Sequence, residues 1–146
     1  MSLVSDVYGV KTDAQFLQTL QDNVRKRGAM SKLVSDSATS ETSKAVQDYL
    51  RWLVIDDWQS EPYRQNHNPA ERRYQDIKRL ANTILDRTGA PNNLWLLALR
   101  YASFVYNHTA VKSLDWKTPI SVLTGITPDI SVLLRFAFYE LVYFKK

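Results

Sequence analysis

Residues 69–88 read PAERRYQDIKRLANTILDRT, and this stretch predicts a long amphipathic helix. Proline is favoured in a first helical turn, so we expect the helix to begin at Pro69. Gly89 and Pro91 should end it. Apolar or small side chains recur every three or four residues, as on a helix that packs one face on a core. The predicted buried stripe consists of Ala70, Tyr74, Ile77, Ala81 and Ile84.

The opposite face of the predicted helix is polar. Spacings of four, three and four residues place four side chains on one stripe: Glu71, Gln75, Lys78 and Asn82. Arg72 and Arg79 lie one step around the helix. A first-turn carboxylate with amide and ammonium groups behind it could hold a metal ion beside bound DNA. A solvated helix face, with Glu71 favoured by the helix dipole, fits the same spacing, so both interpretations stay open.

A second candidate carboxylate is Asp36. It follows a short apolar segment, residues 30–35, that predicts a strand, and it precedes the polar run Ser37-Ala-Thr-Ser40. Aspartate at such a place is commonly a turn residue. Strand ends are also where binding sites assemble in α/β folds, so a functional role is the alternative.

The remaining segments predict mainly helices. Thr12 and Gln15 have the capping-box spacing at the start of one helix, which Gly28 should end. Further helices are expected from Thr42 or Ser43 to Leu53, from Asn93 to His108, and from Thr118 to Leu123, where Gly125 stops the last. Residues 54–58 fit either a helix end or a strand, and residues 61–68 a polar loop. Weak strand patterns cover residues 7–10 and the aromatic tail, residues 136–144.

Composition narrows the class of protein. A chain of 146 residues fits one domain of ordinary size. The net charge of +4 tilts the expectation towards an anionic partner such as nucleic acid, although a mildly basic protein without one fits equally well. The chain has no cysteine, which excludes disulfides and thiol catalysis. No secretory signal and no apolar run near the ~20 residues of a membrane helix is present, so we expect a soluble, intracellular protein with no membrane partner.

Several motifs, in order, resemble the integrase catalytic core of copia-like LTR retrotransposons. The run SEPYRQNHNPAER, residues 60–72, resembles the segment that leads to the last catalytic glutamate of that family. The run LVSDS, residues 33–37, resembles the strand that ends in the second catalytic aspartate. Residues 37–70 separate Asp36 from Glu71, close to the family's spacing. Departures occur at Ser37, Gln65 and His67, and we expect His67 and His108 to be surface or packing residues.

The resemblance continues downstream and covers residues from about 8 to 146. It includes Leu94-Trp95, Tyr106-Asn107-His108, Lys117-Thr118-Pro119 and the run LTGITPDIS, residues 123–131. It implies a partial integrase core over residues 1–135 and the start of a post-core C-terminal segment over residues 136–146.

The resemblance implies an α/β, RNase H-like fold and DNA strand transfer assisted by Mg²⁺ or Mn²⁺. Asp36 and Glu71 would be catalytic metal ligands. The side chains that would face DNA, both the element ends and the target, are Arg72, Gln75, Lys78 and Arg79. The family also implies possible homo-oligomers and a nuclear location.

The family's first catalytic aspartate lies on a strand well before the second, whereas only 35 residues precede Asp36. We therefore expect a core that lacks its first strands, with a helix-dominated remainder, and a chain that is inactive alone. Asp6 is the only early carboxylate in a comparable place. The alternatives are a plain structural remnant and a non-catalytic module for nucleic-acid binding or self-association. The aromatic tail would serve such a module, together with Arg72, Arg73, Lys78, Arg79 and Arg87.

Overall fold

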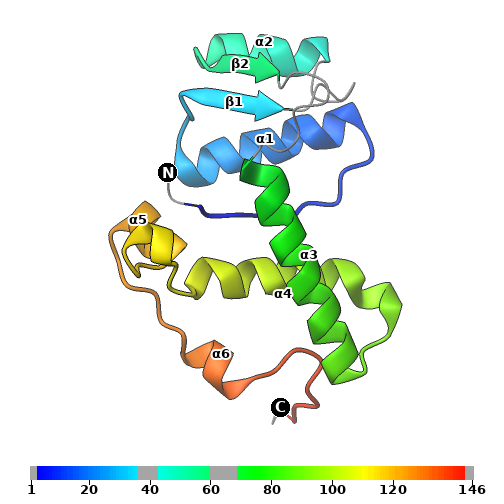
Figure 1. Ribbon diagram of the computed structural model, residues 1–146. Coiled ribbons are helices and arrows are strands. Elements are labelled where there is room, and N and C mark those ends of the chain that lie inside the picture. Colours follow the sequence, from blue (N-terminus) through cyan, green and yellow to red (C-terminus); the bar gives the residue numbers. More distant parts are fainter. Residues whose placement is uncertain (1–2, 36–42, 60–68, 144–146) are drawn as a thin grey trace. The chain divides into compact units, whose positions relative to one another are not determined.

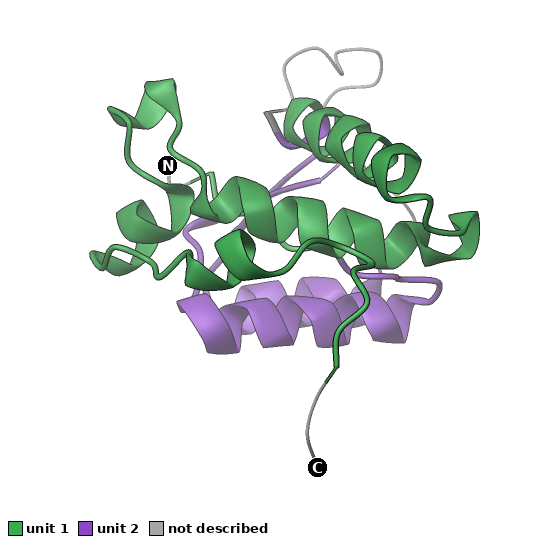
Figure 2. Ribbon diagram, turned by 90° about the horizontal axis from the view of Figure 1, so that it is seen from below, with its two compact units in different colours: residues 1–7, 72–146 green, residues 8–71 purple. Residues whose placement is uncertain are grey.

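The computed structural model describes residues 3–35, 43–59 and 69–143. These residues form two compact units, coloured separately in Figure 2. Unit 2 is residues 8–71, and unit 1 is residues 1–7 together with residues 72–146. The boundary between them falls in the first turn of helix α3 (Pro69–Thr88). The expected loop over residues 61–68 lies outside the described residues.

Unit 2 contains two helices and two short strands (Figure 1). The helices are α1 (Asp13–Arg27) and α2 (Lys44–Trp52), and the strands are β1 (Lys32–Ser35) and β2 (Asp56–Gln59). The strands pair in parallel, with Lys32 opposite Asp56 and Ser35 opposite Gln59. The segment that fitted either a helix end or a strand is therefore largely strand. One core joins both helices and the turn before β2, through Leu20, Val46, Leu50 and Ile55.

Helix α1 begins and ends where its sequence signals predict. The Thr12 hydroxyl accepts a hydrogen bond from the Gln15 N–H at 3.3 Å, and the Gln15 side chain accepts one from the Lys11 N–H at 2.9 Å. This arrangement is a capping box that reaches one residue further back than the usual form. At the other end Gly28 has φ +83°, and its N–H bonds the Val24 carbonyl at 2.8 Å.

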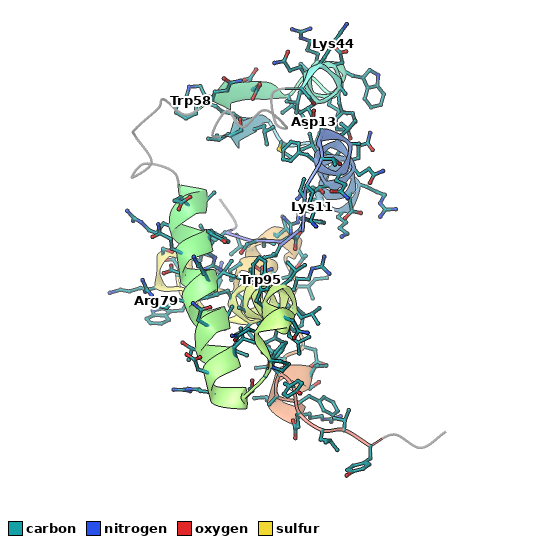
Figure 3. The ribbon with its side chains drawn as sticks, turned by 90° about the vertical axis from the view of Figure 1, so that its right-hand side faces the viewer. Lys11, Asp13, Lys44, Trp58, Arg79 and Trp95 are labelled. Atoms are coloured by element: carbon teal, nitrogen blue, oxygen red, sulfur yellow. The ribbon has the colours of Figure 1, made fainter. Side chains whose placement is uncertain are left out.

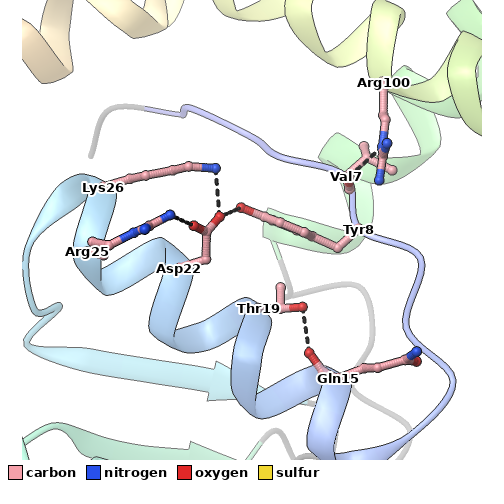
Figure 4. A network of polar contacts seen from close by, with 8 residues as sticks. All are labelled: Val7, Tyr8, Gln15, Thr19, Asp22, Arg25, Lys26 and Arg100. Carbon is pink, nitrogen blue, oxygen red and sulfur yellow. Dashed lines mark hydrogen bonds and ion pairs between the residues drawn. The ribbon is translucent and has the colours of Figure 1, made fainter.

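An ionic cluster ties the start of unit 2 to α1 (Figure 4). The Tyr8 hydroxyl donates to the Asp22 carboxylate at 3.1 Å, while Arg25 and Lys26 each approach the same carboxylate at 2.6 Å. The hydrogen bonds from Lys26 and Arg25 lower the pKa of Asp22 to about 2.

Unit 1 is built on two long helices, α3 and α4 (Trp95–His108). A 3₁₀ turn at Asn92–Leu94 precedes α4, a second at Lys112–Leu114 follows it, and the short helices α5 (Pro119–Thr124) and α6 (Ser131–Arg135) come last. Both helices contribute small and aliphatic side chains to one core. The shared core consists of Ile77, Ala81, Leu85, Ala90, Ala98, Leu99 and Ala102. Thr118 caps α5 and Gly125 ends it, as predicted.

The expected helix-dominated α/β fold with little sheet is confirmed. The expected strands at residues 7–10 and 136–144 are wrong, because the described residues there form no ladder. The Val7 carbonyl instead accepts from Arg100 Nε at 3.4 Å. In the tail, the Phe138 ring lies 5.4 Å from the Tyr101 ring, which anchors that segment on a helix rather than on a strand. Within the described ranges no helix is long and apolar enough to cross a membrane.

Candidate functional site

The polar stripe predicted for α3 is exposed along its length. Glu71 stands in the first turn, and the stripe continues through Gln75, Lys78 and Asn82, all of which are exposed. Arg72 and Arg79 are exposed beside it. The helix thus places one carboxylate at its N-terminal end and cationic or amide groups over the next three turns. This arrangement can contact a polyanion along the helix axis.

Arg79 shows how accessible the cations of this face are. Its side chain is 80% exposed, and Figure 3 shows it projecting from α3 away from α4. Its guanidinium lies 3.8 Å from the Asp76 carboxylate one turn earlier. Exposed pairs of this length contribute little to stability, so this contact leaves Arg79 able to bind a phosphate.

The structure describes one of the two predicted metal ligands but not the other. Glu71 is described and exposed, whereas Asp36 lies outside the described residues, directly after the buried Ser35 that ends β1. Within the described ranges no group of three or more His, Cys, Asp or Glu side chains could hold a metal ion. Both the metal role and the catalytic role of Asp36 and Glu71 stay predictions.

Comparison with solved structures identifies the fold. The integrase catalytic core domain of HTLV-2 in complex with magnesium, in its trimeric form, is similar with a TM-score of 0.60 and 20% identity, over 77% of this chain and 70% of that chain. The catalytic core domain of BIV integrase gives a TM-score of 0.60 at 18% identity, over 82% and 76%. This chain has the fold of a retroviral integrase catalytic core. The RNase H-like expectation is thereby confirmed.

A longer integrase chain gives the same result. In the intasome of simian T-cell lymphotropic virus in complex with PP2A regulatory subunit B56 gamma, the similar chain has a TM-score of 0.66 and 20% identity. The match covers 84% of this chain and 45% of that one, so this chain spans less than half of that integrase. No family model and no curated protein matches the sequence.

The inner side of the integrase-core helix α3 departs from the predicted stripe. Ala70 and Tyr74 are exposed, and burial begins only at Ile77. Arg73, which the sequence grouped with possible DNA-binding cations, is half-buried on this side. Its guanidinium lies 4.6 Å from the centre of the Tyr106 ring and 3.5 Å from the Tyr106 carbonyl. Burial lowers the pKa of Arg73, and this side chain braces α3 against the end of α4.

Sequence reasoning gave no role to Asn107, yet its side chain clamps the start of the chain to α4. Asn107 Oδ1 accepts from the Ser5 N–H at 3.0 Å, and Asn107 Nδ2 donates to the Ser5 carbonyl at 2.7 Å. The Ser103 hydroxyl donates to the same carbonyl at 2.7 Å. Ser103 and Asn107 are both buried. The signal was present, since Leu99, Ser103 and Asn107 recur every fourth residue on the buried side of the helix.

Proposed function

We propose that this chain is part of the catalytic core of a copia-like retrotransposon integrase, whose parent protein integrates DNA by metal-dependent strand transfer. The observation that carries the proposal is the exposed polar stripe of α3, which begins at Glu71 in a chain with the integrase-core fold. The run at residues 60–72 adds the copia-like resemblance directly before this stripe. We expect no strand transfer from these residues alone, because the resemblance supplies only two of the family's three catalytic carboxylates.

DNA is the proposed partner of the exposed side of α3. Arg72, Lys78 and Arg79 would contact phosphates, which position a duplex without reading its sequence. The Gln75 side chain lies one turn after Glu71, among these cations, and would form a hydrogen bond with the DNA. Charge supports this surface, because the three cations lie on one side of a helix. Among the described residues, only Arg79 has a carboxylate within ion-pair distance, that of Asp76 at 3.8 Å.

The first test is DNA binding by the double variant Lys78→Ala with Arg79→Ala. Removing two phosphate contacts should reduce the slope of log K against log[salt] by about 1.8, equally for unrelated duplex sequences. The control is Lys44→Ala with Arg51→Ala, which removes the same charge from α2 and should leave the slope nearly unchanged. Equal effects from both pairs would mean that net charge, rather than α3, attracts the DNA.

The second test concerns the metal. Asp36 and Glu71 are proposed to hold Mg²⁺ or Mn²⁺, since carboxylate oxygens suit these hard cations. Glu71→Gln should abolish the binding of Mn²⁺ measured by calorimetry, with the helical circular dichroism unchanged. Asp13→Asn is the matched control, because Asp13 is likewise an exposed carboxylate in a first helical turn. Unchanged Mn²⁺ affinity in Glu71→Gln would remove the metal site from the proposal.

Self-association without catalysis is a second candidate, supported by the tail. Large apolar side chains of the tail and of α6 just before it are open to solvent: Leu134 of α6 is 79% exposed, and Leu141 and Tyr143 of the tail are 77% and 93% exposed. The HTLV-2 integrase cores occur in trimeric and dimeric forms. Sedimentation of the chain and of Leu134→Ser with Leu141→Ser tests this candidate, which predicts that only the unaltered chain forms oligomers.

A further inference from the structure

Residues 111–117, here named the Trp116 loop, connect α4 to α5 and are closed by their own backbone. Val111 and Lys117 form an antiparallel bridge, with the Val111 N–H 3.1 Å from the Lys117 carbonyl. The Val111 carbonyl accepts from both the Leu114 N–H at 3.0 Å and the Trp116 N–H at 3.1 Å. The Lys117 N–H bonds the Leu114 carbonyl at 3.0 Å. These bonds hold the loop in one conformation.

The backbone of this loop is strained where it presents its largest side chain. Asp115 has φ +53° and Trp116 has φ +62°, so two successive non-glycine residues are left-handed. A bulky residue rarely adopts this conformation, which persists only where the surrounding bonds determine it. The Trp116 side chain gains no compensating burial, since it is 70% exposed. In the part of the chain that the structure describes, no other ring stacks on it.

Two lysines belong to the same loop as Trp116. Lys112 and Lys117 are both exposed, and no described carboxylate lies within ion-pair distance of either ammonium. Asp115 is the only acidic residue in the sequence of the loop, so the loop as a whole carries a net positive charge. An exposed indole in a backbone-bonded loop that also carries two lysines is a combination suited to unpaired nucleotides, because bases stack on aromatic rings and lysines contact the backbone phosphates.

We propose that the Trp116 loop is a second nucleic-acid contact, in which Trp116 stacks on an unpaired base while Lys112 and Lys117 bind the adjacent phosphates. This proposal rests on the proposed function in one respect, namely that DNA is a partner of the chain. Charge separates it from a protein interface, because lysine and aspartate are depleted where proteins pack together. It also differs in kind from α3, whose exposed stripe offers polar groups to a phosphate backbone and no indole to a base.

The experiment is anisotropy titration of a labelled single-stranded oligonucleotide and of the matching duplex. Trp116→Ala should weaken single-strand binding about ten-fold, within the range for loss of one stacked base, and Trp116→Phe should retain most of the affinity. Trp116→Gly suits a positive φ and should match the alanine variant, which excludes misfolding as the cause. Trp52→Ala is the matched control, because Trp52 is 77% exposed at the end of α2, and it should change nothing.

Salt dependence separates the two parts of the contact. Trp116→Ala should leave the salt slope unchanged, since stacking releases no counterions, whereas Lys112→Ala with Lys117→Ala should reduce it by about 1.4 for a single strand. Equal losses in the Trp52 and Trp116 variants would overturn the proposal, as would dissociation of a dimer by Trp116→Ala in sedimentation. Failure of the Lys78 and Arg79 variant to affect duplex binding would remove the α3 surface and leave this proposal standing.

Discussion

Replacement of Asn107 by alanine should loosen the start of the chain from α4 without disturbing the helix itself. The substitution removes three hydrogen bonds: one of 3.0 Å from the Ser5 N–H, one of 2.7 Å to the Ser5 carbonyl, and a longer one of 3.4 Å from the Ser5 hydroxyl. Ser103 still donates to that carbonyl, whereas the Ser5 N–H and hydroxyl both lose the acceptor that Asn107 provides. The two shorter hydrogen bonds, at a net 0.5–1.5 kcal/mol each, predict that the free energy of unfolding of unit 1 falls by about 1–3 kcal/mol.

Asn107→Asp sharpens the prediction, because it keeps the size and the acceptor but replaces the donor. At neutral pH it would put a carboxylate oxygen 2.7 Å from the Ser5 carbonyl, at a site with 6% exposure. Repulsion and burial both raise the pKa of the new carboxyl above its unfolded value. The protonated form can donate as Asn107 does, so its stability is present at low pH and is lost as the pH rises through the raised pKa.

Urea unfolding followed by circular dichroism measures both variants. Asn93→Ala, an exposed asparagine in the 3₁₀ turn before α4, is the control and should change the midpoint very little. Asn107→Asp should be less stable than Asn107→Ala near pH 7 and should recover relative to it near about pH 4. Hydrogen exchange at the Ser5 amide should accelerate in Asn107→Ala, which removes the acceptor of that N–H. If Asn107→Ala resembled Asn93→Ala in midpoint and in Ser5 exchange, the clamp would contribute nothing and the reasoning would fail.

Three further predictions follow from buried or paired side chains. Asp22→Asn should lower stability above about pH 4, and the difference should shrink as the pH falls through about 2, because the pKa of Asp22 is about 2. Urea midpoints across pH measure this difference. Arg72→Ala should weaken DNA binding at unchanged stability, whereas Arg73→Ala should cost about 1 kcal/mol of stability and leave the salt slope of DNA binding unchanged. Leu50→Ala, at 1% exposure, should cost about 2–5 kcal/mol in urea unfolding, against less than ~0.5 kcal/mol for the exposed Trp52→Ala.

The helices could be predicted because their ends are encoded locally. Thr12 and Gly28 act on backbone groups within four residues, and both perform the roles expected of them. Helix α6 had such a signal that was overlooked, since the Asp129 carboxylate accepts from the Ser131 N–H at 2.8 Å. The strand expected at residues 7–10 failed for the opposite reason. The backbone just before it bonds Asn107, 102 residues further along the chain, and no local pattern contains that partner.

The candidate site divides in the same way. Exposure of Glu71, Lys78 and Arg79 followed from helical spacing, and the structure confirms it. Helical spacing says nothing about a bound metal ion or DNA, nor about the position of Asp36. The metal and DNA roles of these side chains therefore stay predictions. The division expected after residue 135 also stays a prediction. Helix α6 ends at Arg135, but residues on both sides of that point belong to the same compact unit.

The position of Arg73 could have been predicted from its spacing along the helix, although its charge suggested a place among the exposed cations. Grouping cations by number placed it with Arg72 and Arg79, but it precedes Ile77 by four residues, and spacings of three and four then lead to Leu80 and Ile84. Arg73 therefore belongs to the stripe that faces the core. A cation there needs a partner that tolerates burial, and the face of the Tyr106 ring at 4.6 Å is one. Arg73 stabilises the inner side of the helix, whereas Arg72 and Arg79 are exposed on its outer side. The proposed DNA contact and the stability of the fold therefore depend on different cations, and the Arg72 and Arg73 variants should separate the two.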